Sequence, residues 1–290
     1  MNVDLIDGTY ELFRHHYGLP SAVREKGSRT AATRGVLTSV VAMLEGGATH
    51  VGVATDHVIE SFRNEMWPGY KSSVGMPEDL VAQFPLLEEG LSAAGVTVWA
   101  MVEQEADDGL AAAAAMADAD SDVEQVRIHT VDKDLAQCVQ DNRVVQVDRR
   151  KQVVFDVAGV QEKFGVVPSS IPDWLGLVGD SSDGYPGLPG WGAKSTAAVL
   201  RRYEHIESVP VRFERWDVHV SGAMRLAAVL AERMEEALLF RDLATLRTDA
   251  DVGTVDAMRW RGPTAELAAM CERLNADALL RRYEAVAERV

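Results

Sequence analysis

The segment Gly179–Thr196 reads G-D-S-S-D-G-Y-P-G-L-P-G-W-G-A-K-S-T and joins an acidic half to a half suited to anions. Asp180 and Asp183 come directly before a turn rich in glycine and proline, and Lys194 follows that turn. Glycines in such a turn let backbone N–H groups approach an anion such as a phosphate. A divalent cation between the carboxylates and a phosphodiester would explain why acidic residues lie next to an anion-binding turn. Whether the chain has a metal site therefore depends on its other carboxylates.

The chain before this segment has the pattern of an α/β domain. Short apolar runs with β-branched residues alternate with helical patterns over about the first 160 residues. Such alternation predicts a mainly parallel sheet with helices on both faces, and an active site beyond the carboxyl ends of the strands. The expected strands are 3–6, 49–55, 96–101, 126–131 and 144–147, with 153–156 as a hairpin partner of the last.

Strand patterns disappear beyond residue 160, and apolar spacings typical of helices replace them. The expected helices are 168–178, 194–203, 221–246 in one or two pieces, and 264–290. We therefore expect two domains: an α/β domain at 1–165 and an all-helical domain at 166–290, with a helix-to-helix turn at 184–194.

The formal net charge of -16 taken alone argues against a nucleic-acid partner, because phosphate binding normally leaves a basic footprint. Bound metal ions would cancel part of this charge. The two cysteines lack C-x-x-C spacing, so no zinc site or disulfide framework is indicated. The first eight residues carry two acids, Asp4 and Asp7, where a signal peptide would need basic and then long apolar stretches. No apolar run approaches the roughly 18 residues of a membrane span. We expect a soluble, cytoplasmic protein without a membrane partner.

Carboxylates recur at expected strand ends, at one helix start and in the glycine-rich segment. A single Asp after a strand is usually a helix cap or turn residue, but capping alone does not explain so many. Like charges this close need cations to stay ionised, and oxygen ligands without His or Cys favour Mg²⁺ or Mn²⁺. Two such ions could cleave a phosphodiester. The candidate ligands are Asp7, Asp56, Glu105, Asp107, Asp108, Asp132, Asp134, Asp180 and Asp183.

The turn at 186–192 has two readings. It could be a tight connection between helices, or a helix-hairpin-helix that contacts a DNA backbone through its glycines and the following helix start. Lys194, Ser195 and Thr196 directly after the glycines favour the second reading. Such contacts would be independent of base sequence. Trp191 could fill the core or press on the DNA backbone.

Six motifs together closely resemble the bacterial 5′-3′ exonuclease and flap endonuclease family, which also forms the amino-terminal domain of many bacterial DNA polymerases I. The resemblance runs from about residue 3 to residue 249, and the last motif is the most specific. The motifs are D-G at 7–8, the pairs F-R at 62–63 and Y-K at 70–71, E-A-D-D at 105–108, D-K-D at 132–134, and G-D-S-S-D-x-x-P-G-x-P-G-x-G-x-K at 179–194.

This resemblance implies a PIN-like α/β nuclease domain with a helical arch around 62–95, followed by a helix-three-turn-helix DNA-binding domain. It implies a divalent-metal-dependent, structure-selective nuclease that hydrolyses 5′ flaps and 5′ ends of DNA at junctions and at nicked or gapped duplexes, in replication and repair. Residues 72–75 read S-S-V-G, where relatives often place an arginine, so we expect a shorter and less basic arch.

The resemblance also implies roles for single residues. Asp7, Asp56, Glu105 and Asp107 would hold a first ion, and the other five candidate carboxylates would form a second site or its outer shell. Lys71, with Arg63 nearby, would stabilise charge developing on the scissile phosphate. Backbone carbonyls of the turn could hold K⁺. The DNA-binding residues would be Arg14, Gly187, Gly190, Gly192, Lys194, Ser195 and Thr196.

Two alternatives to a flap nuclease stay open. One is a non-catalytic junction-binding protein that keeps its acids as structural charge, against which the full set of carboxylates with Lys71 argues. The other is a PIN-type ribonuclease, which would not need the glycine turn. Cleavage of DNA and RNA flaps in one assay separates the three.

Overall fold

The computed structural model of the protein describes residues 1–20 and 28–289. Its chain divides into two compact units that are not consecutive in sequence. Unit 1 comprises Met1–Ile59, Ser73–Thr130 and Thr248–Val290, and unit 2 comprises Glu60–Ser72 and Val131–Arg247. None of the helices within the described ranges has the length and apolar character that a membrane span requires.

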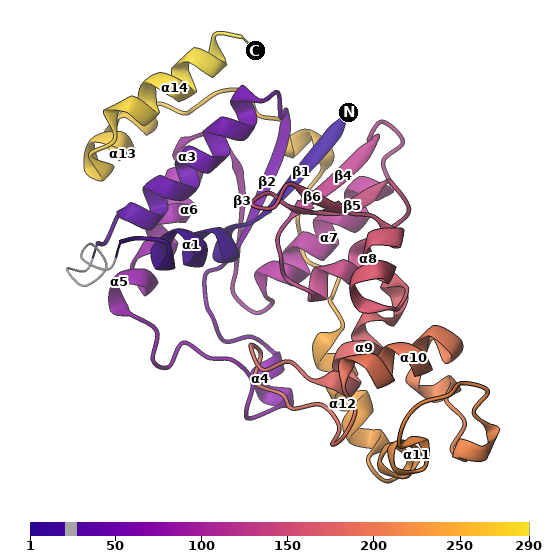
Figure 1. The fold of residues 1–290 in the computed structure, drawn as a ribbon. Helices are drawn as coiled ribbons and strands as arrows, with labels where there is room; N and C mark the ends of the chain where they lie inside the picture. Colours follow the sequence, from indigo (N-terminus) through magenta and orange to yellow (C-terminus); the bar gives the residue numbers. More distant parts are fainter. Residues whose placement is uncertain (21–27, 290) are drawn as a thin grey trace. The chain divides into compact units, whose positions relative to one another are not determined.

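The strands form a mostly parallel sheet, as the sequence predicts, and their order in it is β3-β2-β1-β4-β5-β6 (Figure 1). The strands of unit 1 are β1 (Asn2–Asp7), β2 (His50–Asp56), β3 (Thr97–Met101) and β4 (Gln125–His129), and those of unit 2 are β5 (Val144–Asp148) and β6 (Val153–Phe155). Strands β1 to β4 pair in parallel, whereas β5 and β6 form an antiparallel hairpin. Asp7 pairs with Ala54 and Asp56 with Met101, so both acids lie at carboxyl ends of neighbouring strands.

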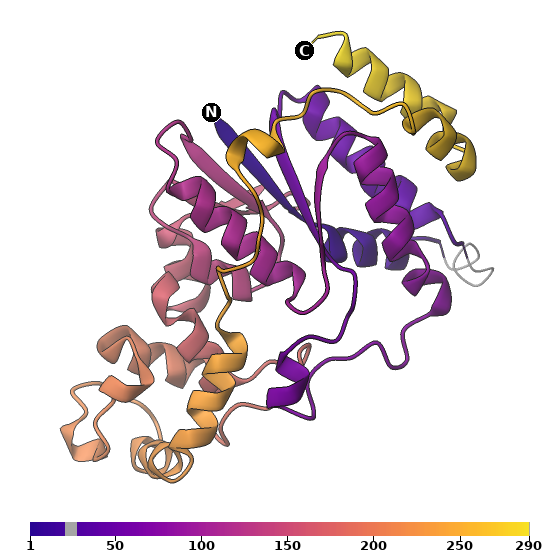
Figure 2. The same ribbon diagram turned by 180° about the vertical axis from the view of Figure 1, so that it is seen from behind.

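Helices cover both faces of the strands in unit 1. In both views α3 and α7 lie on opposite sides of β1 to β3 (Figures 1 and 2). The apolar stripe of α3, from Val36 to Leu44, is buried. The helices are α1 (Gly8–Tyr17), α3 (Ala31–Glu45), α5 (Glu78–Val81), α6 (Gln83–Ala93), α7 (Ala106–Asp118), the 3-10 helix η5 (Val255–Met258), α13 (Leu267–Leu274) and α14 (Asp277–Ala287).

The last helices pack with unit 1, which departs from a linear division at residue 165. Leu267, Leu274 and Tyr283 are buried in the same core cluster as the helices α3 and α6, and the Tyr283 hydroxyl donates to the Leu37 carbonyl at 3.0 Å. Burial of these apolar side chains explains why the segment joins unit 1. The expected helix at 264–290 is two helices, because Asn275 adopts a left-handed conformation with φ 53°.

Unit 2 is mainly helical and has its own core. Its α9 and α12 approach closely, since a Cβ on Gly176 would meet the Arg241 backbone nitrogen at 2.8 Å. Helix α8 is not among the sequence expectations. The helices are α4 (Arg63–Met66), η1 (Asp134–Cys138), α8 (Val157–Phe164), η2 (Pro168–Ser170), α9 (Ile171–Val178), α10 (Ala193–Tyr203), η3 (Ile206–Ser208), η4 (Phe213–Arg215), α11 (Ala223–Glu232) and α12 (Met234–Ala244).

The region expected to form an arch, 62–95, is not one continuous element. Helix α4 belongs to unit 2, whereas Leu87 and Leu91 of α6 are fully buried in the core of unit 1. An arch helix would expose such side chains, so α6 is a core helix. The part that remains for an arch is 67–77, which carries no helix or strand.

Candidate metal centre and nucleic-acid interface

The carboxylates at the strand ends of unit 1 are held by backbone and hydroxyl donors. Asp7 caps helix α1, since its Oδ1 accepts from the Tyr10 N–H at 2.7 Å, and its Oδ2 accepts from the Thr130 hydroxyl at 2.8 Å. Asp56 Oδ1 accepts from the N–H of Ala106, the first residue of α7, at 2.7 Å. Both side chains are buried, so their orientation is fixed from within the protein.

The acidic start of α7 forms a reciprocal cap. The Asp108 side chain accepts from the Glu105 N–H at 3.0 Å, and the Glu105 side chain accepts from the Asp108 N–H in return. Both residues are buried, whereas Asp107 is half-buried. Helix capping explains in part why acidic residues occur here. Two buried carboxylates within one helical turn also need positive charge nearby to remain ionised.

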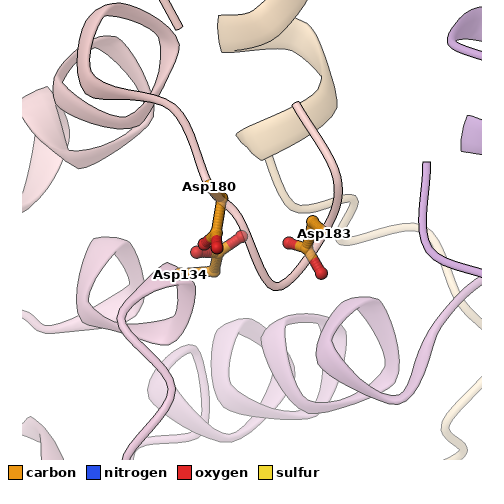
Figure 3. A group of neighbouring side chains, drawn as sticks. All are labelled: Asp134, Asp180 and Asp183. Carbon is orange, nitrogen blue, oxygen red and sulfur yellow. The ribbon is translucent and has the colours of Figure 1, made fainter. Parts of the chain in front are cut away.

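In unit 2 the structure brings together Asp134, Asp180 and Asp183 (Figure 3). One carboxylate oxygen from each lies within 4.8 Å of the others. Asp134 and Asp180 are buried and Asp183 is half-buried. Asp132 is exposed, and its carboxylate accepts from the Asp134 N–H at 3.0 Å, which makes it an orienting neighbour of this cluster.

The two aspartates of the glycine-rich segment are positioned by one tight turn. Asp180 and Tyr185 form a β-bridge with N–H to carbonyl distances of 2.9 and 3.0 Å, and the Gly184 N–H donates to the Asp180 carbonyl at 2.9 Å. Gly184 has φ 84°, a conformation that glycine adopts without strain. The turn therefore places Asp183 near Asp180 by backbone geometry.

Two lysines pair with these aspartates. Lys133 Nζ lies 2.5 Å from Asp180 Oδ2, and Lys71 Nζ lies 3.2 Å from Asp183 Oδ1. Asp180 Oδ1 accepts from the Ser182 N–H at 2.8 Å. Lys133 was not among the residues that the sequence assigned to the site, although it stands inside the D-K-D motif.

The environment of Asp134 shows whether this cluster is suited to binding a cation. Burial, followed by repulsion from Asp132, Asp183 and Asp180, raises the pKa of its carboxyl well above the ordinary range. Its Oδ1 is buried and has no hydrogen-bond partner within the described ranges. A hard divalent ion would give this oxygen a partner and favour the ionised form, so the donor set fits such an ion.

The segment before Lys71 packs onto the turn that carries Asp183. The Trp67 indole N–H donates to the Gly184 carbonyl at 3.1 Å, and a Cβ on Gly184 would meet the Gly69 carbonyl oxygen at 2.0 Å. The Asn64 side chain donates to the Lys71 carbonyl at 2.9 Å. Trp67 and Asn64 thus fix the backbone of Lys71; the motif pairs had not identified either residue.

Arg63 is buried, with 1% of its surface exposed. Its Nε donates to the Leu243 carbonyl at 2.7 Å and its Nη2 to the Thr245 carbonyl at 3.2 Å, at the end of α12. Unpaired carbonyls at a helix end are satisfied by such donors. The expectation of a catalytic Arg63 is therefore corrected: its guanidinium binds backbone carbonyls inside unit 2.

The glycine turn and the start of α10 form an open concave surface of about 550 Å³. Gly190 and Gly192 are exposed, and a Cβ on Gly192 would meet nothing within 4 Å. Lys194 is exposed on the first turn of α10, and Ser195 caps that helix through the Gly192 N–H at 3.1 Å. This surface also includes His219 and Ser221, which come from a distant part of the sequence and were not predicted.

Two of the expected DNA-binding residues of the turn face inward. Thr196 is fully buried, and Gly187 is buried where a Cβ would meet the Gly179 nitrogen at 2.3 Å. Their roles are corrected to packing. Trp191 is also core, with 4% of its surface exposed and its indole N–H donating to the Leu226 carbonyl at 3.3 Å.

Arg14 lies on α1 in unit 1. Its guanidinium pairs with the buried carboxylate of Glu11 and contacts His15 Nε2 at 2.9 Å. This pairing orients the side chain, which is partly exposed.

Two family models match consecutive parts of the chain. The N-terminal resolvase-like domain of 5′-3′ exonucleases matches residues 2–165, and the C-terminal SAM fold of 5′-3′ exonucleases matches residues 166–266.

Similar curated proteins include DNA polymerase I of Bacillus caldotenax, 33% identical over 97% of this chain and 32% of the polymerase. The 5′-3′ exonuclease of Aquifex aeolicus is 30% identical over 86% of this chain and 82% of its own length. The chain thus spans about a third of the polymerase relative. A solved structure of a bacteriophage T5 D15 flap endonuclease variant, a pseudo-enzyme-product complex with DNA and metal ions, has a TM-score of 0.65 at 16% identity, covering 99% of this chain and 98% of its own. At that identity the likeness shows the fold.

Proposed function

Because the chain belongs to the 5′-3′ exonuclease family, we propose that it is a divalent-metal-dependent, structure-selective nuclease that hydrolyses 5′ flaps and 5′ ends of DNA. The observation that carries this proposal is the cluster of Asp134, Asp180 and Asp183, with a buried carboxylate oxygen that lacks a partner within the described ranges. Such a cluster has little use in a protein that only binds DNA, because DNA is itself an anion.

The proposed ligands are carboxylates of both units, and Mg²⁺ or Mn²⁺ are the proposed ions, because every donor is a hard oxygen. When bound, divalent ions supply positive charge that activates water and stabilises the leaving oxygen of a phosphodiester. The residues of unit 1 are Asp7, Asp56, Glu105, Asp107 and Asp108, and those of unit 2 are Asp132, Asp134, Asp180 and Asp183.

Lys71 is the proposed catalytic residue besides the ligands. Asn64 and the Asp183 carbonyl hold its backbone, at 2.9 Å in each case. The backbone held in this way keeps the Lys71 ammonium beside the aspartate cluster, where it can stabilise negative charge on a phosphate. The proposed role of Arg63 is to support this segment through its hydrogen bonds to the end of α12.

The proposed duplex-binding surface is the concave surface at Gly190, Gly192, Lys194 and Ser195. Backbone N–H groups at the start of α10 and the Lys194 ammonium suit a phosphate, and contacts of this kind carry no base specificity. We also propose that the backbone carbonyls of this turn bind K⁺. Arg14 is proposed to contact the DNA backbone, and residues 67–77 are proposed to contact single-stranded flaps. The proposed place of action is the cytoplasm, where bacterial DNA is replicated and repaired.

Cleavage of a 5′-labelled DNA flap in Mg²⁺ or Mn²⁺ tests the proposal, with EDTA as the control. We expect metal-dependent product, and its length distinguishes release of whole flaps from release of single nucleotides. Flap binding without cleavage in either metal would favour a non-catalytic junction-binding protein. Preferential cleavage of an RNA flap of the same sequence would favour a ribonuclease.

A further inference from the structure

We propose that Lys133 is an internal counter-ion that a divalent ion displaces from Asp180, and that the displaced ammonium then pairs with a phosphate of the substrate. This inference rests on the proposed nuclease function. It assigns to Lys133 a role in coupling metal binding to DNA binding.

Lys133 contacts the Asp180 oxygen that a metal ion would use as a ligand. Asp180 is 3% exposed, and its Oδ1 is already taken by the Ser182 N–H at 2.8 Å. Its Oδ2 is taken by Lys133 Nζ at 2.5 Å. An ion that uses Asp180 Oδ2 must therefore replace the lysine, because an ammonium and a metal ion cannot both approach one oxygen closely.

Two lysines partly balance the charge of this aspartate cluster. Lys133 and Lys71 each pair with one of its aspartates, and two ammonium groups carry the same total charge as one divalent ion. Exchange of the lysines for an ion leaves the aspartates neutralised to the same degree. The two ammonium groups are then available to another anion, and the phosphodiester is the anion that the proposed reaction brings.

The side chain of Lys133 is able to move away from Asp180. Its side chain is 31% exposed, and a lysine has a flexible four-carbon stem that rotates without disturbing the backbone. Asp180, by contrast, is fixed by the β-bridge to Tyr185. Displacement therefore moves the lysine and leaves the ligand in place.

Calorimetric titration of the full, DNA-free chain with Mn²⁺ tests the first half. Lys133→Met removes the competing charge, so we expect Mn²⁺ to bind on the order of tenfold more tightly, the effect of one close charge pair. Lys133→Arg keeps the charge and should bind Mn²⁺ as the wild type does. Lys151→Met, at an exposed lysine beside Asp148, is the matched control and should change nothing. Unchanged or weaker Mn²⁺ binding by Lys133→Met would overturn the inference.

Binding of a flap DNA by anisotropy, with and without Ca²⁺ in place of the catalytic ion, tests the second half. The gain in DNA affinity on adding metal should be on the order of tenfold smaller for Lys133→Met than for wild type and for Lys151→Met. An equal gain in all three overturns the transfer to phosphate. Because Mn²⁺ affinity is read without DNA, a protein that fails to cleave flaps but shows the Lys133 effect refutes the proposed function and keeps the competition. Thermal unfolding in EDTA verifies that each variant is folded.

Discussion

Lys71 and Asp183 meet through side chain and backbone: the ammonium lies 3.2 Å from the carboxylate, and the Lys71 N–H donates to the Asp183 carbonyl at 2.9 Å. A proposed catalytic cation and a proposed metal ligand thus depend on the same turn. Displacing that turn disturbs both groups together.

Replacing Asp183 by alanine should lower turnover of a flap substrate on the order of a hundredfold, because a group that organises transition-state charge is lost. DNA affinity should change far less, since the proposed duplex-binding surface is the one around Lys194. Single-turnover kinetics and anisotropy measure the two effects. Asp217→Ala, at an exposed aspartate that pairs with Arg202, is the control. Equal loss of turnover and affinity would mean that Asp183 is structural.

Gly184→Ala should destabilise the protein more than Gly222→Ala. Both glycines have positive φ, 84° and 75°, so each alanine incurs about 1–2 kcal/mol of backbone strain. Only at position 184 does the new Cβ meet backbone, the Gly69 carbonyl oxygen at 2.0 Å, whereas position 222 is open. Urea unfolding measures the difference. If the two variants lose equal stability, the close approach of the segments around Gly69 and Gly184 does not contribute to stability.

Lys194→Met should weaken binding of any duplex to a similar degree and reduce the slope of log affinity against log salt by about one. The reason is that one fewer phosphate counter-ion is released. Titrations at several salt concentrations, on two unrelated duplexes, provide the measurement. Lys151→Met serves as the matched lysine control. A sequence-dependent loss would contradict a backbone-only role for Lys194.

Arg63→Met should lower the free energy of unfolding by about 3 kcal/mol or more, because two hydrogen bonds from a charged donor are worth about 1.5–3 kcal/mol each. The lost donors leave the Leu243 and Thr245 carbonyls at the end of α12 without this partner. Arg233→Met, at an arginine that pairs with Glu236, should cost well under 1 kcal/mol. Full stability of Arg63→Met with loss of turnover would instead support direct catalysis.

Stability should fall on acidification partly because of His50. Burial, with repulsion from Arg259 next, lowers the pKa of His50 below its ordinary value of 6.5. The unfolded chain therefore takes up a proton near pH 6.5 that the folded chain resists, so this contribution is present above pH 6.5 and is lost as pH falls from there through the lower pKa of the folded state. His50→Asn should narrow the stability difference between pH 7.5 and pH 5.5 in urea unfolding. An unchanged difference would exclude this histidine as a source.

The strands of unit 1 and the helices around the glycine turn were predictable, because apolar periodicity and turn residues are local properties of the sequence. The antiparallel hairpin of β5 and β6 follows from the same signals, as does the helical region at 221–246, for which the sequence left one or two pieces open. Helix α8 was missed because its short segment carries only one buried residue, Val160. The return of α13 and α14 to unit 1 depends on a distant partner surface and leaves no local signal.

The cluster in unit 2 was also predictable in part, since Asp134, Asp180 and Asp183 belong to two short motifs. The motifs could not separate exposed from buried members, so Arg63 and Thr196 were assigned to chemistry and DNA although both are buried. Motif residues thus include packing residues beside the reacting groups. Lys133 and Trp67 act through partners far away in sequence, which only the folded chain specifies.

The discontinuity of unit 1 has a consequence for synthesis on the ribosome. All of unit 2 has been made once residue 247 is added, whereas the core of unit 1 also needs Leu267, Leu274 and Tyr283. Domains generally fold as units while the chain emerges. Residues 1–59 therefore belong to the unit whose core is completed last, and the helical unit that carries the glycine turn is free to fold before it.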